Sequence, residues 1–110
     1  MTEWLSQLFF RNKAVHIYYP ALIRLTKVST EEAPNTSRGE TAAKFVVSVI
    51  KGSDVVIFDH KTAGLTEQDL KYMSAVIEHL YDLPKYEHVL TQYQLLLDSI
   101  FKVWPQLDTQ

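Results

Sequence analysis

Two amphipathic segments between Thr66 and Trp104 constrain the fold of this chain more than any other feature. The first begins at Thr66, where a hydroxyl can accept a hydrogen bond from a free backbone N–H and so cap a helix. The acidic residues that follow suit the positive end of a helix dipole. Pro84 ends the segment, because a residue that precedes proline avoids the helical conformation. The apolar residues in between have the spacing of one buried helix face: Leu70, Met73, Ile77, Leu80 and Tyr81.

The second segment keeps its apolar residues on one face for about five turns and ends at Pro105. Because the connection at Leu83-Pro84 is short, we expect the two helices to be antiparallel and to share a core. The residues of this second face are Tyr86, Val89, Leu90, Tyr93, Leu96, Leu97, Ile100, Phe101 and Trp104.

A further apolar stripe lies away from these main faces. At about 100° per residue, four residues of the first helix fall together, and one residue of the second helix lies opposite its main face. Either the rest of the chain covers this stripe, or it contacts a partner or a second copy, since contiguous exposed apolar patches usually mark interaction sites. The predicted partner-binding residues are Tyr72, Val76, His79, Leu83 and Leu95.

Length and composition limit the class of protein. The 110 residues predict one domain, residues 1–110, and a hydrophobic fraction of 46% with 22% charged residues is ordinary for a globular protein. The absence of cysteine excludes disulfides, thiol catalysis and cysteine-based metal sites. No apolar run approaches the roughly 20 residues of a membrane span, and the start of the sequence lacks the features of a signal peptide. We therefore expect a cytoplasmic protein.

The charge is distributed unevenly along the chain. Residues 1–66 hold eight Lys or Arg against six Asp or Glu, whereas residues 67–110 hold three against seven. An acidic C-terminal half disfavours nucleic-acid binding there. A nucleic-acid-associated regulator remains the alternative function, using basic residues of the N-terminal part: Arg11, Lys13, Arg24, Lys27, Arg38, Lys44, Lys51 and Lys61.

The residues before His60 predict a small sheet. Residues 2–10 fit a short N-terminal helix, and residues 13–28 are rich in β-branched and aromatic residues, with Pro20 at an edge or bulge. A helix that begins at Pro20 is the competing interpretation. Residues 29–40 are polar and rich in turn-forming residues, which predicts an exposed loop. Two apolar runs then flank the sequence KGSD, which predicts a hairpin over residues 44–60, although a buried helix that ends at Gly52 is an alternative.

These elements predict an α+β domain. It would contain an N-terminal helix, a small antiparallel sheet from about residue 14 to residue 60, and two antiparallel C-terminal helices that cover one face of the sheet. The alternative is an all-α helical bundle, in which the apolar runs before residue 60 are helices.

No group of residues predicts catalysis or a cofactor. Asp59 and His60 follow a predicted strand, but neighbours on a strand point to opposite faces. His79 and His88 flank the helix junction without the spacing of a metal site, so we predict no metal. The three glycines stand alone, which disfavours a nucleotide-binding loop. The predicted function is a non-catalytic protein–protein interaction module, an adaptor, inhibitor or regulator that binds another protein or pairs as a homodimer.

Overall fold

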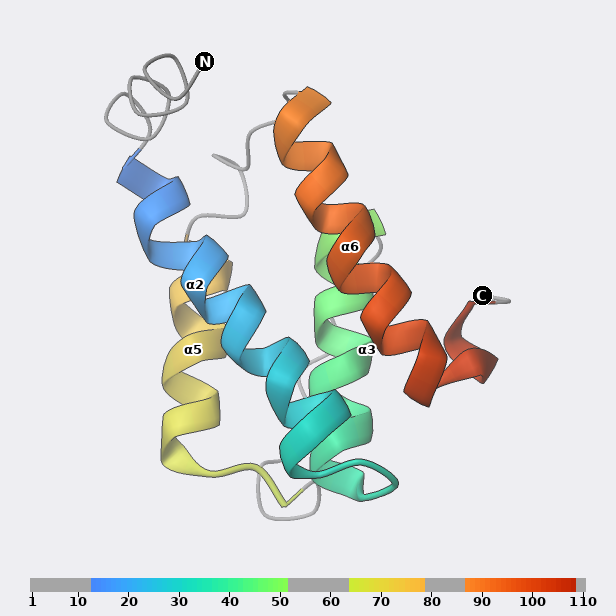
Figure 1. Cartoon of the computed structure of the whole chain (residues 1–110). Coiled ribbons are helices and arrows are strands. Elements are labelled where there is room, and N and C mark those ends of the chain that lie inside the picture. The colour runs from blue at the N-terminus through green and yellow to red at the C-terminus, as the bar shows by residue number, and fades with distance from the viewer. Residues whose placement is uncertain (1–12, 52–63, 79–86, 109–110) are drawn as a thin grey trace.

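The computed structural model describes residues 13–51, 64–78 and 87–108, and helices dominate all three ranges (Figure 1). These residues contain no strand, so the predicted α+β fold with its sheet is wrong and the all-helical alternative holds for them. The predicted N-terminal helix over residues 2–10 lies outside the described residues. In chain order the elements are α2 (Lys13–Lys27), the π-helix η1 (Val28–Glu32), α3 (Ser37–Lys51), α5 (Glu67–Glu78), α6 (Glu87–Val103) and the 3-10 helix η3 (Pro105–Leu107).

Residues 13–28 form a helix and not strands, because their buried residues follow the helical period. Ala21, Leu22, Leu25 and Val28 are all at most 2% exposed, and their spacing of one, three and three residues places them on one helix face. Pro20 lies inside α2, where it removes one backbone N–H but is itself exposed. Burial of the apolar face thus outweighs the β propensity of the surrounding residues.

The predicted hairpin over residues 44–60 is also wrong where the structure describes it. Residues up to Lys51 belong to α3, and residues 52–63 lie outside the described ranges. Helix α3 has a wide buried face, since Thr41, Ala42 and Ala43 span about 200° of the helix and are each at most 8% exposed. The apolar run from Phe45 to Ile50 is interrupted only by Ser48, so over this short length a wide buried helix face resembles a strand that is buried on both faces.

The predicted loop over residues 29–40 is a compact helix-to-helix connection. It consists of η1, a short turn with Asn35 in the left-handed conformation (φ 60°), and the start of α3. The Thr36 hydroxyl accepts a hydrogen bond from the Gly39 N–H at 3.1 Å and caps α3. Gly39 also lies so close to Ala33 that a Cβ on this glycine would overlap the Ala33 carbonyl oxygen. Only glycine fits this approach.

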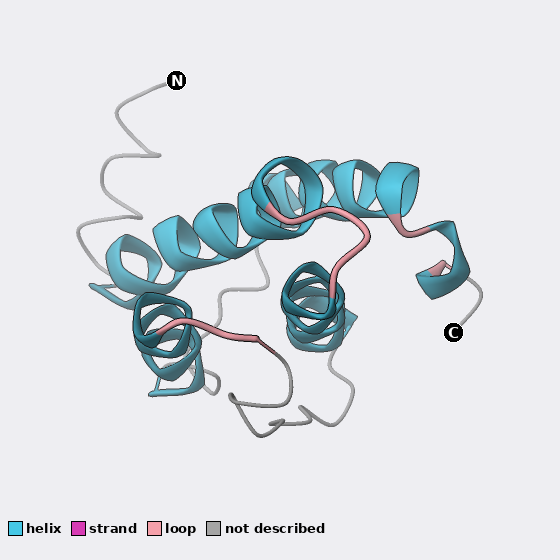
Figure 2. Ribbon diagram, turned by 90° about the horizontal axis from the view of Figure 1, so that it is seen from below, coloured by secondary structure: helices cyan, strands magenta, loops and turns pink. Residues whose placement is uncertain are grey.

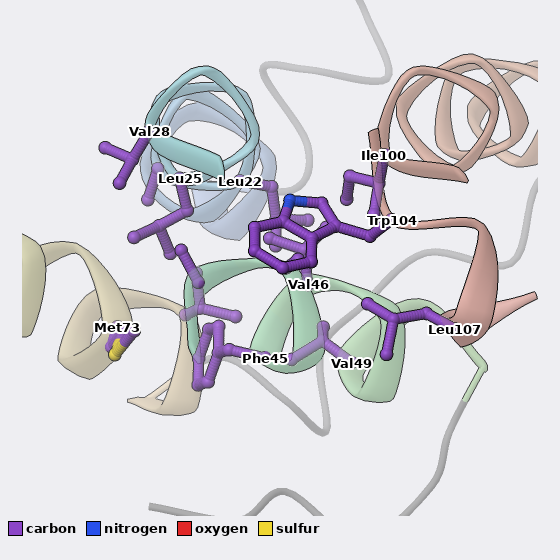
Figure 3. Packing of buried hydrophobic residues seen from close by; sticks show 14 of the residues in the cluster. Leu22, Leu25, Val28, Phe45, Val46, Val49, Met73, Ile100, Trp104 and Leu107 are labelled. Carbon is purple, nitrogen blue, oxygen red and sulfur yellow. The ribbon is translucent and has the colours of Figure 1, made fainter. Parts of the chain in front are cut away.

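The described helices lie in two layers. Helices α2 and α6 form one layer, which lies across α3 and α5 in the other (Figures 1 and 2). Helix α2 packs on both α5 and α3, and α6 packs mainly on α3, η1 and α2. Helices α5 and α6 run in opposite directions, as predicted for an antiparallel pair, but neither is the other's main packing partner (Figure 1). The core between the layers contains Leu22, Leu25, Val28, Phe45, Val46, Met73, Ile100 and Trp104 (Figure 3).

The π-helix η1 ties the end of α6 to the core. In η1 the Ala33 N–H donates to the Val28 carbonyl at 2.8 Å, the five-residue spacing of a π-helix. The next donor at this spacing, for the Ser29 carbonyl, would come from Pro34, which has no N–H. The indole Nε1–H of Trp104 donates to the Ser29 carbonyl instead, at 2.8 Å. A buried acceptor without a backbone donor is thereby satisfied by a side chain from the far end of the chain.

Candidate interaction surface

The structure separates the five predicted partner-binding residues. Val76 is fully buried in the core, and Tyr72 is half-buried. Helix α5 buries Asp69, Met73 and Val76, so its core face lies between the two apolar stripes that the sequence suggested. Leu95 is exposed on α6, whereas His79 and Leu83 lie outside the described residues. Tyr72 and Leu95 therefore do not belong to one patch.

Tyr72 belongs to the contact between α5 and α2. Arg24 of α2 forms an ion pair with Glu32 at 2.7 Å. The hydrogen bond to Glu32 raises the pKa of Arg24, and the hydroxyl of Tyr72 contributes to the same effect. The Tyr72 side chain is thus engaged within the chain.

Leu95 has a different environment. Its exposed fraction is 57%, and among the residues whose burial the structure describes no other large hydrophobic side chain is exposed. A single exposed leucine is common on protein surfaces, so the residues around it decide whether it is part of a surface for binding.

Leu95 lies within a continuous stripe along α6, which we call the α6 stripe. Its members recur at three- and four-residue intervals, so they share one side of the helix. Leu95 is accompanied there by two half-buried apolar side chains, Leu96 and Val103, around the small residue Ser99. The α6 stripe consists of Gln92, Leu95, Leu96, Ser99, Lys102 and Val103.

The α6 stripe lies beside the core face of the same helix. Tyr93, Leu97, Ile100 and Trp104 are at most 6% exposed and form that core face, as the sequence predicts. Helix α6 is at the edge of the bundle, so one side of it faces away from the other described helices (Figure 1). The sequence pattern places Leu96 on the core face, and neither predicted apolar face includes Val103. Both follow the apolar period closely enough to resemble core residues, and only the packing shows that they are half exposed.

The polar groups of the α6 stripe are compatible with its burial by a partner. The Ser99 hydroxyl donates to the Leu95 carbonyl within the helix at 3.1 Å, so burial of Ser99 leaves no unpaired donor. Asp98 accepts a hydrogen bond from Gln94 at 2.8 Å on the neighbouring side of the helix. Lys102 forms no ion pair with any residue in the described ranges, and its aliphatic stem can pack on apolar groups.

A buried acidic residue, Asp69, has a structural role. It is 2% exposed and accepts hydrogen bonds from Arg38 Nε at 2.7 Å and from the Thr66 N–H at 3.0 Å. Burial alone raises the pKa of Asp69, but the hydrogen bonds from Arg38 and Thr66 outweigh it and hold the pKa below its ordinary value. In return the Asp69 N–H donates to the Thr66 hydroxyl at 3.1 Å. This reciprocal capping box fixes the start of α5.

Four of the five basic residues between positions 19 and 51 are engaged within the chain, and the fifth, Lys27, is exposed. Arg24 is paired with Glu32, Arg38 with Asp69, and Lys44 with Glu40 at 2.8 Å. The Lys51 ammonium lies 5.3 Å from the centre of the Phe101 ring. These pairs reduce the positive potential that a nucleic acid would meet.

The candidates for chemistry lie mostly outside the described residues. These are Asp59, His60, Lys61 and His79, whereas His88 is in the first turn of α6 and its side chain is not described. Within residues 13–51, 64–78 and 87–108, no three His, Asp or Glu side chains are placed to hold a metal ion. In the same ranges, no helix has the length and apolar character that crossing a bilayer requires.

Comparisons with models of protein families, with curated proteins and with solved structures find no match to this chain.

Proposed function

We propose that this chain is a small non-catalytic protein–protein interaction module whose contact surface is the α6 stripe. The observation that supports this most strongly is the 57% exposure of Leu95 next to the small residue Ser99, with the half-buried Leu96 and Val103 on the far side of Ser99. Removing such apolar surface from water favours association, and the helix is already held rigidly by its core face. An adaptor, inhibitor or regulator needs only such a surface.

The proposed site of action is the cytoplasm. A chain without cysteine is compatible with a reducing compartment, since it needs no disulfide for its stability. Its fold is stabilised by a hydrophobic core instead, because helices α2, α3, α5 and α6 all contribute buried apolar side chains to one cluster.

The test compares two variants: one carries a new positive charge on the α6 stripe, and the other carries the same charge outside the stripe. Leu95→Lys places an ammonium in the stripe, whereas Gln94→Lys places it on an exposed position about 140° around the helix from Ser99. Both variants should keep the circular dichroism spectrum and melting temperature of the parent chain, because neither side chain is buried.

Tagged parent and variant proteins would then be used to capture partners from the source cells, with and without nuclease. We expect the parent and Gln94→Lys to retain one protein after nuclease treatment, and Leu95→Lys to lose it. Retention of that protein by Leu95→Lys would contradict the proposed surface. Loss of every captured species after nuclease would favour the nucleic-acid-associated regulator instead.

A further inference from the structure

We draw no further inference here: the strongest candidate, the surface patch around the exposed Leu95 on the outer side of α6, belongs to the site already described, and nothing in the structure shows what covers it.

Discussion

At the scale of single residues, the most consequential contact joins Trp104 to the Ser29 carbonyl over a sequence distance of 75 residues. Pro34 makes this contact necessary, because it removes the backbone donor that a further π-helical turn would supply. The indole thus combines a buried apolar ring, 5% exposed, with a specific hydrogen bond. The Trp104 ring holds the end of α6, and with it the orientation of the α6 stripe.

Replacing Trp104 with Phe should therefore lower the free energy of unfolding. The loss should be about 1–3 kcal/mol from the unpaired Ser29 carbonyl, with some addition from the smaller ring. Urea denaturation measures it. In a Pro34→Ala background, where an N–H is restored near Ser29, the same substitution should cost less. Unchanged stability of Trp104→Phe would show that this hydrogen bond is not important for the fold.

Gly39 is a second residue whose identity the packing dictates. Gly39→Ala should lower the free energy of unfolding by roughly 1–3 kcal/mol, because the new Cβ overlaps the Ala33 carbonyl and forces the backbone apart. Thermal unfolding measures the change. Ser48→Ala, in the interior of the same helix, is the control and should be neutral or slightly stabilising. If both variants unfold at the same temperature as the parent chain, the close approach at Gly39 carries no energetic weight.

At the scale of elements, the parts of the fold that could be predicted are those with local signals. Thr66 was predicted to cap a helix, and its hydroxyl does accept the Asp69 N–H at the start of α5. The core face of α6 was also predicted, because Tyr93, Leu97, Ile100 and Trp104 keep the helical period. Both predictions depend only on residues within one turn or one face.

The elements that could not be predicted are those whose environment comes from the rest of the chain. Helix α3 has a wide buried face because α2, α6 and η1 all contact it, so the apolar run from Phe45 to Ile50 cannot be distinguished by its period from a buried strand. In α5 the core face is set by where α2 lies, which places Val76 inside and leaves Leu70 and Ile77 half-buried. Of the α6 stripe, only Leu95 was predicted as a partner-binding residue. The sequence has apolar residues on two sides of this helix and does not reveal which side the rest of the chain covers.

The capping box of α5 should make the stability of the protein depend on pH in the acid range. Since the pKa of Asp69 lies below its ordinary value of about 3.8, its contribution is complete above that value. The contribution should be lost as the pH falls through the lowered pKa in the folded state. Asp69→Asn should cost roughly 2–4 kcal/mol near neutral pH, since it breaks a largely buried pair with Arg38.

This pH dependence is measured by urea denaturation of the parent chain and Asp69→Asn between neutral pH and about pH 3. The difference between the two proteins should be constant near neutral pH and should shrink only below about pH 4, near the ordinary pKa of a carboxyl group. Asp98→Asn, at an exposed position, is the control and should show a small difference throughout. A difference that grows towards low pH would contradict the capping role of Asp69.

At the scale of the whole molecule, the two-layer arrangement determines which apolar side chains remain accessible. Helix α3 is contacted by α2, η1 and α6, whereas α6 is at the edge of its layer and has one side without a described neighbour (Figure 2). The same helix therefore contributes Ile100 and Trp104 to the core and presents Leu95 to solvent. Interaction through Leu95 requires no rearrangement of the core, because Leu95 lies on the opposite side of α6 from the buried Leu97, Ile100 and Trp104.

The central claim is that the α6 stripe is the surface through which this protein associates. Chemical shifts of the backbone amides of isotope-labelled protein, recorded before and after addition of the protein captured from the source cells, test it most directly. We predict changes that cluster on Gln92, Leu95, Leu96, Ser99, Lys102 and Val103 and that disappear in Leu95→Lys but persist in Gln94→Lys. Amide shifts that stay constant when the captured protein is added, or changes that cluster around Tyr72 between α2 and α5, would contradict the claim.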